Sequence, residues 1–247
     1  MYTALIILAG GSGKRLDYST NTPKQFINIG SKNIIEYFLD NLDKNIFDII
    51  VIVCDSKMKK KHLTDLKKKF FWHNIHFTQS GFNRQDSSKR GVFFLNKFKP
   101  KKVLIHDAAR PLANNKLIKK LIKNINASLV CAPYILLNDY VKYKISEEII
   151  NNNSLILIQT PQAFSYKVVF KAHKMIRNNN AKDDTTLTEK IGIKTKLIKG
   201  SKTNIKITYK EDLEIFNLLK RKKRRYGIGY DIHKIDSNSK KNLFYVG

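Results

Sequence analysis

Apolar runs of strand length alternate with helix-like segments along most of this 247-residue chain, and this alternation limits the possible folds more than any other feature. The apolar runs are ALIILA, DIIVIVC, KVLIH and SLVCAP, at residues 4–9, 48–54, 102–106 and 128–133. The helix-like segments cover residues 34–42, 57–70, 86–95 and 115–125. Continuously apolar strands separated by helices are typical of parallel sheets that are covered on both faces. The sequence therefore predicts an α/β fold with a doubly wound, mostly parallel sheet.

Two regions interrupt this alternation. Residues 134–158 are rich in asparagine and strand-like pieces and are too long for an ordinary connection, which predicts a protruding β-arm. Further on, the basic run RKKRR follows the last helix-like segment and precedes a new strand-like pattern. We expect one large domain over residues 1–221, a basic linker at 222–225 and the first strands of a second domain at 226–247.

The formal net charge is +27, and a strongly positive charge is common in nucleic-acid-binding proteins. Here the lysines are scattered along the whole chain, and neither a base-reading motif nor interleaved aromatic residues accompany them. We therefore expect no specific nucleic-acid partner, and a basic nucleic-acid-binding protein remains the less favoured alternative. The charge would instead help to attract anionic substrates.

The remaining composition predicts a cytoplasmic protein that does not contact a membrane. No apolar run approaches the ~20 residues of a membrane span. The N-terminus lacks the basic start and the long apolar stretch of a signal peptide. Cys54 and Cys131 lie inside strand-like apolar runs, which predicts two buried, reduced thiols.

The stretch LAGGSGKR, residues 8–15, ends the first apolar run with three glycines and two cations. Glycines let backbone N–H groups approach an anion closely, and the cations neutralise its charge, so the stretch predicts a phosphate site. The P-loop pattern fails because position 8 is leucine, and the dinucleotide-binding pattern fails because position 16 is leucine. What remains is L-A-G-G-x-G-x-R, followed by PKQF at residues 23–26.

Three further motifs follow in order: HDAARP at 106–111, TPQAF at 160–164 and NIKIT at 204–208. Together with the glycine loop and PKQF, they resemble the 2-C-methyl-D-erythritol 4-phosphate cytidylyltransferase family, which has a fold of the nucleotide-diphospho-sugar transferase type. The resemblance covers roughly residues 1–220. It implies transfer of CMP from CTP to 2-C-methyl-D-erythritol 4-phosphate with release of pyrophosphate. It also implies Mg²⁺ as cofactor and a homodimer formed through the arm.

The resemblance further implies roles for individual residues. The catalytic cations would be Arg15, Lys24 and Lys206. The polyol phosphate would be bound by Asp107, Arg110 and Tyr140, with Asp107 also near the metal. The CTP-binding residues would come from the glycine loop and from GFNRQDSS at 81–88, namely Ala9, Gly10, Gly11, Gly13, Lys14, Arg84 and Ser87.

Two positions depart from the family pattern, and both lie on the acceptor side. Tyr140 stands where the family usually has threonine, and Asn152 stands where it usually has arginine. These departures leave the use of CTP intact and bear on the identity of the polyol phosphate. The glycine loop is also close to that of ribitol 5-phosphate cytidylyltransferases, so that activity is the alternative enzymatic function.

The stretch RYGIGYDIHKI, residues 225–235, places Asp231 and His233 two positions apart, on one face of an expected strand. It resembles the first strand of 2-C-methyl-D-erythritol 2,4-cyclodiphosphate synthase, a lyase that is known in fusions with the cytidylyltransferase. The two side chains suit Zn²⁺ or a similar ion, but a catalytic zinc needs three protein ligands and no histidine follows His233. We therefore expect a bifunctional protein whose second domain is truncated, with an incomplete metal site.

Overall fold

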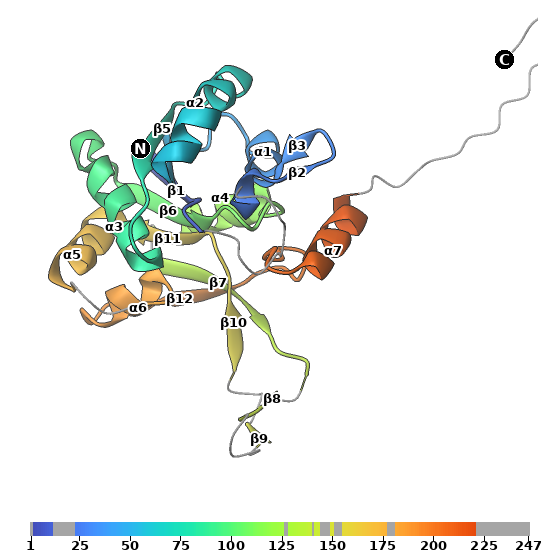
Figure 1. Cartoon of the computed structure of the whole chain (residues 1–247). Coiled ribbons are helices and arrows are strands. Elements are labelled where there is room, and N and C mark those ends of the chain that lie inside the picture. Colours follow the sequence, from blue (N-terminus) through green and yellow to red (C-terminus); the bar gives the residue numbers. More distant parts are fainter. Residues whose placement is uncertain are drawn as a thin grey trace, which may run out of the picture.

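The computed structural model describes residues 2–11, 23–125, 128–139, 141–143, 149–150, 155–176 and 181–220. An eight-stranded sheet in the order β10-β7-β11-β6-β1-β4-β5, with β12 paired to β7, forms its centre (Figure 1). The strands are β1 (Thr3–Leu8), β4 (Ile49–Cys54), β5 (Ile75–Gln79), β6 (Lys102–Asp107), β7 (Val130–Leu136), β10 (Ile156–Ile158), β11 (Gln162–Ser165) and β12 (Lys196–Lys199). β1 is parallel to β4 and β6, β4 to β5, and β12 to β7. The predicted doubly wound, mostly parallel sheet is confirmed.

Helices cover both faces of this sheet, as the continuously apolar strands predict. Alternate residues of β1 point to opposite faces: Leu5 and Ile7 belong to one buried cluster, Ala4 and Ile6 to the other. The first cluster is completed by α1 (Ile34–Asp40), α2 (Ser56–Lys69) and α4 (Asn115–Asn124). The second is completed by α3 (Arg84–Phe94), α5 (Tyr166–Met175) and the short helix η3 (Leu95–Phe98). Cys54 and Cys131 are both buried, as predicted, and they form no disulfide with each other.

One strand breaks the parallel pattern. β11 lies between β6 and β7 and is antiparallel to both. The sequence pattern does not predict this insertion, because TPQAF is too short and too polar to stand out as a core strand. The chain enters β11 on its return from the arm, so its direction is opposite to that of the neighbouring crossover strands.

The predicted arm leaves the body of the protein between β7 and β10, which pair in antiparallel fashion. Beyond them the strands β8 (Val141–Lys142) and β9 (Ile149–Ile150) pair with each other and lie away from the main sheet (Figure 1). The described residues of this region therefore form the protruding β-arm expected from the sequence.

The last described helix, α7 (Lys210–Lys220), packs on the main domain. Its residues Leu213 and Phe216 share a buried cluster with Ile34 of α1, with Ile207 and with Ile29 of β2 (Asn28–Ile29), which pairs with β3 (Lys32–Asn33). The motif NIKIT thus packs, through Ile207, against α1, β2 and the closing helix α7. In the described part of the chain, no helix combines the length and the apolar character that crossing a membrane requires.

Candidate active site

A cavity of about 590 Å³ opens at the carboxyl ends of β1 and β6. Ligands of doubly wound sheets bind at this edge, since the loops after the parallel strands meet there. Five segments line the cavity: the glycine loop, the PKQF motif, the loop and helix start after β5, the end of β6, and the segment before α7. The lining residues are Leu8, Gly10, Gly11, Lys24, Gln25, Gly81, Phe82, Asn83, Arg84, Ser87, Asp107, Ala109, Lys206 and Thr208.

The glycine loop approaches its neighbours too closely for a side chain at one position. A Cβ atom on Gly10 would lie 2.4 Å from the Cβ atom of Ser80, so only glycine fits there without movement. At Gly11, by contrast, no described atom lies within 4 Å of such a Cβ, and the residue borders the open cavity. The Ala9 N–H donates to the Val53 carbonyl at 2.7 Å, which continues the register of β1 and β4 into the loop.

Gln25 holds this loop from the side of the PKQF motif, a role that the sequence motifs do not predict. It lies in the short helix η2 (Lys24–Phe26), and 2% of its surface is exposed. Its amide donates to the carbonyls of Ala9 and Gly11. In the sequence, Gln25 is marked only by its place inside the PKQF motif, in which the charged residue Lys24 is the more obvious candidate for a function.

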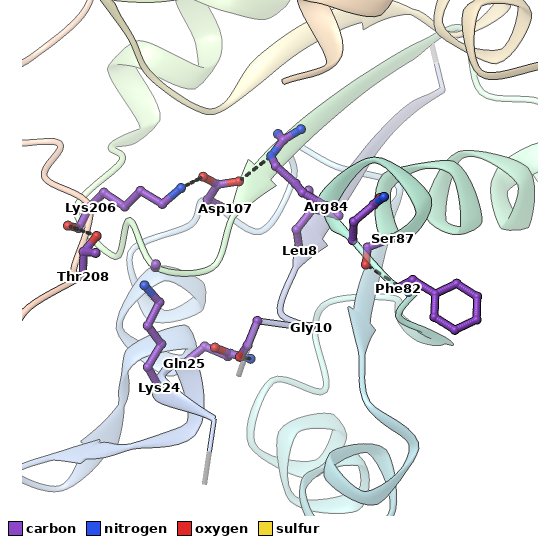
Figure 2. A pocket seen from close by; sticks show the side chains of 14 residues that line it. Leu8, Gly10, Lys24, Gln25, Phe82, Arg84, Ser87, Asp107, Lys206 and Thr208 are labelled. Carbon is purple, nitrogen blue, oxygen red and sulfur yellow. Dashed lines mark hydrogen bonds and ion pairs between the residues drawn. The ribbon is translucent and has the colours of Figure 1, made fainter. Parts of the chain in front are cut away.

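Three predicted residues form a chain of charges along one wall of the cavity (Figure 2). The Lys206 Nζ atom donates to Asp107 Oδ2 at 2.6 Å, and the Arg84 Nε atom lies 3.5 Å from Asp107 Oδ1. Burial alone would raise the pKa of Asp107. The charges of Arg84 and Lys206, with the hydrogen bond from Lys206, instead hold that pKa well below its ordinary value. Asp107 is therefore a carboxylate at neutral pH.

Lys24 borders the same cavity as this charged chain (Figure 2). Its Nζ atom donates to the Ile207 carbonyl at 2.6 Å, so PKQF and NIKIT are joined next to the cavity. Lys24 and Lys206, which are 182 positions apart in the sequence, thus both border the space where the sequence analysis placed a nucleotide.

The motifs HDAARP, TPQAF and NIKIT are joined by a buried polar network behind Asp107. The Asp107 N–H donates to Thr160 Oγ1 at 3.0 Å, and the Asn204 amide donates to the Thr160 carbonyl at 2.9 Å. His106 is fully buried, and this burial lowers its pKa to about 3, so its ring is neutral. Its two ring nitrogens lie 3.3 Å from Thr160 Oγ1 and 3.1 Å from the Arg110 carbonyl. The three motifs therefore fix the backbone that carries Asp107.

Arg110, predicted to bind the polyol phosphate, does not line this cavity. Its Nη1 atom donates to the Asn204 carbonyl at 2.7 Å, and its buried Nε atom has no hydrogen-bond partner among the described residues.

Ser87 and Arg84 do border the cavity, at the start of α3. The Ser87 hydroxyl accepts a hydrogen bond from the Gly81 N–H at 3.0 Å and so closes the turn before the helix.

Several predicted site residues lie outside the described part of the chain. They are Gly13, Lys14 and Arg15 of the glycine loop, Tyr140 and Asn152 of the arm region, and Asp231 and His233 of the tail. Their predicted roles rest on the sequence alone.

The residues at the cavity fit the divalent ion that the resemblance implies. Mg²⁺ in nucleotide sites is commonly held by one or two carboxylates together with substrate phosphates and water. Among the described lining residues Asp107 is the only carboxylate, and it is ionised. Within those same described ranges, no three His, Cys, Asp or Glu side chains form a group able to hold an ion by themselves. One carboxylate thus suits an ion whose other ligands come mostly from the nucleotide phosphates and water.

Comparison with known proteins agrees with this arrangement. The sequence model of the IspD family, 2-C-methyl-D-erythritol 4-phosphate cytidylyltransferase, matches residues 3–221. The 2-C-methyl-D-erythritol 4-phosphate cytidylyltransferase of Caldicellulosiruptor bescii is 38% identical over 222 residues, which cover 87% of this chain and 96% of the relative. The bifunctional enzyme IspD/IspF of Pelagibacter ubique is 37% identical over 253 residues, which cover 100% of this chain and 63% of the relative. The chain therefore spans less than two thirds of that bifunctional relative.

Solved structures give the same result. The bifunctional IspDF of Campylobacter jejuni has a TM-score of 0.72 at 28% identity, over 87% of this chain and 54% of its own. The 4-diphosphocytidyl-2C-methyl-D-erythritol synthase of Anaerococcus prevotii has a TM-score of 0.76 at 27% identity, over 89% of this chain and 96% of its own. With the five motifs assembled at one sheet edge, these matches show that the chain belongs to the 2-C-methyl-D-erythritol 4-phosphate cytidylyltransferase family.

Proposed function

We propose that this chain transfers the cytidylyl group of CTP to 2-C-methyl-D-erythritol 4-phosphate. An oxygen of the acceptor's phosphate monoester attacks the α-phosphorus of CTP. The bond from that phosphorus to the oxygen shared with the β-phosphate breaks, and pyrophosphate leaves. The products are 4-diphosphocytidyl-2-C-methyl-D-erythritol and pyrophosphate. The observation that carries the proposal is the cluster of Lys24, Lys206 and Arg84 around one cavity, in a member of this family.

Both reactants are anions, so the main tasks of the enzyme are to bring them together and to stabilise the negative charge that develops at the α-phosphate. Lys24 and Lys206, with Arg15 of the glycine loop, are the cations to which we assign that charge. We assign Arg84, Ser87 and the glycine-loop backbone to CTP binding. The neutral His106 and its partners keep Asp107 in place behind the reacting groups.

We propose Mg²⁺ as the cofactor, held by Asp107 and the phosphates of CTP. When bound, the ion would neutralise phosphate charge and help to orient the triphosphate. The hydrogen bond between Lys206 and Asp107 then gives Asp107 a second task, since the carboxylate holds Lys206 at the cavity before substrates bind.

The assay that tests this proposal is pyrophosphate release from CTP with each polyol phosphate supplied in turn. We expect release with 2-C-methyl-D-erythritol 4-phosphate and a lower kcat/KM with ribitol 5-phosphate. Absence of release with every acceptor, together with binding to nucleic acid that weakens steeply with salt, would favour the nucleic-acid alternative.

We also propose that the protein acts as a homodimer through the arm. The exposed apolar side chains of this region, Leu136, Tyr143 and Leu157, support the proposal. Sedimentation of the protein at micromolar concentration tests it, because a fully active monomer would contradict the proposed role of the arm. The cytoplasmic location stays a prediction from composition.

Residues 226–247 are proposed to begin a second, cyclodiphosphate synthase-like domain after a linker at 222–225. Two observations support this boundary. The family model ends at residue 221, whereas the alignment with the bifunctional relative continues over the whole chain. Asp231 and His233 are proposed to bind Zn²⁺ or a similar ion with a third ligand from another segment. Metal titration of the protein and of its His233→Ala variant tests this assignment.

A further inference from the structure

A fully buried carboxylate lies directly behind the cavity wall. Asp184 is the first residue of α6 (Asp184–Glu189), and its side chain is 0% exposed. The carboxylate accepts hydrogen bonds from Ser88 Oγ at 2.5 Å, from His173 Nε2 at 2.9 Å and from Arg84 Nη1 at 2.9 Å. Ser88 and His173 are themselves fully buried. A buried charge requires such partners, and here they come from α3 and α5, whereas Asp184 comes from α6.

Local structure fixes Asp184 at this point. The preceding residue, Asp183, caps α6 by accepting the Thr186 N–H at 3.0 Å. The Asp184 N–H faces Gln162 Oε1 of β11 at 3.3 Å, and the Gln162 amide donates to Asp183 Oδ2 at 3.0 Å. The start of α6 is thereby attached to the central sheet, which leaves the Asp184 side chain little freedom.

Arg84 connects this buried carboxylate with the one in the cavity. Its Nη1 atom contacts Asp184, its Nε atom faces Asp107 at 3.5 Å, and its Nη2 atom is buried without a hydrogen-bond partner among the described residues. A guanidinium is planar and rigid, so fixing one edge fixes the direction of the others. The guanidinium is thus held between the two carboxylates, with its Nη1 atom at Asp184 and its Nε atom toward Asp107, while Arg84 as a whole still lines the cavity.

We propose that Asp184 is a positioning residue for nucleotide binding, which holds one edge of Arg84 so that the Nε edge stays beside Asp107 at the wall of the nucleotide cavity. Asp184 does not line the cavity and acts only through Arg84. Ser88 and His173 complete the hydrogen bonding of the carboxylate on its other oxygen, Oδ1, and stabilise the fold without contributing to nucleotide binding. This inference rests on the proposed use of CTP.

The test is steady-state kinetics of Asp184→Asn with CTP and 2-C-methyl-D-erythritol 4-phosphate. The substitution keeps the shape of the side chain but removes the charge that anchors Arg84. We expect the KM for CTP to rise about tenfold while kcat and the KM for the acceptor change by less than about threefold, since uniform binding of the nucleotide is what is lost. An unchanged KM for CTP in the folded variant would overturn the proposal.

Ser88→Ala is the matched control. It removes a hydrogen bond to the same carboxylate and should lower the melting temperature, but it leaves the contact between Arg84 and Asp184 in place. We expect its KM for CTP to match the wild type at a temperature where circular dichroism shows both variants folded. A rise equal to that of Asp184→Asn would show that any damage to this buried group has the same effect, and would overturn the specific role of Asp184.

Arg84→Lys covers the case in which Asp184→Asn does not fold. Lysine keeps the charge but cannot contact both carboxylates through a rigid fork. We expect the single variant to raise the KM for CTP. Where Asp184→Asn does fold, the double variant should show no further rise, because both changes remove one interaction. Wild-type affinity in Arg84→Lys would overturn the proposal. Absence of turnover in the wild type would instead refute the proposed function, so the two failures are distinguishable.

Discussion

The Nζ atom of Lys206 lies 2.6 Å from the Oδ2 atom of Asp107, although the two residues are 99 positions apart in the chain. The pair joins the segment before α7 to the carboxyl end of β6, at the edge where the cavity opens. Lys206 therefore reaches the cavity only after the chain between residues 107 and 206 has folded.

Lys206→Ala should reduce turnover by ~10²-fold or more, because it removes a cation assigned to the charge that develops at the α-phosphate. Lys24→Ala and Arg15→Ala should have effects of similar size. The measurement is pyrophosphate release, with circular dichroism to establish that each variant is folded. Lys202→Ala, at an exposed position in the same segment that does not line the cavity, is the control and should retain wild-type turnover. Near-normal turnover in all three site variants would contradict the assignment.

Acid should destabilise the protein through its buried carboxylates. The folded-state pKa of Asp184, about 2, lies below the ~3.9 of an aspartate in an unfolded chain. Burial opposes this shift, and the Arg84 charge with the hydrogen bonds from His173 and Ser88 causes it. A depressed pKa contributes stability that is fully present above the unfolded value, and it is lost as the pH falls from about 4 to about 2.

Urea unfolding at a series of pH values measures this contribution. Over that acidic window the wild type should lose roughly 2 kcal/mol more of its unfolding free energy than Asp184→Asn, which has no carboxyl to protonate. Parallel losses in the two proteins would show that Asp184 is not the group responsible.

Gly10→Ala should destabilise the protein by about 1–3 kcal/mol, because the new Cβ atom would overlap Ser80 and displace the glycine loop. Gly11→Ala is the matched control for stability, since no described atom would lie within 4 Å of its Cβ. Thermal unfolding of the two variants should therefore differ, with only Gly10→Ala showing a lower melting temperature. Equal melting temperatures would mean that the loop adjusts freely at Ser80.

The acceptor should remain 2-C-methyl-D-erythritol 4-phosphate despite Tyr140 and Asn152. Loss of family-typical contacts to the acceptor phosphate removes binding that is shared by ground state and transition state, so it should raise the KM more than it lowers kcat. Restoring the family residues with Tyr140→Thr and Asn152→Arg should then lower the KM for this acceptor. A higher kcat/KM for ribitol 5-phosphate in the unaltered chain would show that the acceptor assignment is wrong.

Deleting residues 226–247 should leave cytidylyl transfer intact. The described part of the first domain is closed by α7, whose Leu213 and Phe216 are buried against Ile34 and Ile207. The family motifs also end before that helix. The comparison is CTP turnover by the chain with and without the tail. Loss of activity in a folded deletion variant would place the tail in the first active site and move the proposed domain boundary.

Much of the site could be predicted because its residues lie in short motifs. Lys24, Lys206, Arg84 and Ser87 were expected at the nucleotide or its reaction, and Asp107 at the polyol phosphate and the metal. All five border one cavity. Gln25 and Asp184 were not expected to matter. Each is an ordinary polar residue in sequence, and its importance comes from the groups it meets: the Ala9 and Gly11 carbonyls for Gln25, and Arg84 for Asp184.

Local sequence patterns are enough to predict the covered sheet and the phosphate-binding turn. Apolar runs with helices between them require a sheet covered on both faces, and a glycine-rich turn after the first strand allows backbone to approach an anion. The position of β11, antiparallel between β6 and β7, becomes visible only in the folded domain. The pairs Asp107–Lys206 and Asp184–Arg84 likewise form only when the domain is folded. The partners in these two pairs are 99 and 100 positions apart in the sequence. Each contact therefore depends on the packing of the whole domain and cannot be predicted from a short stretch of sequence.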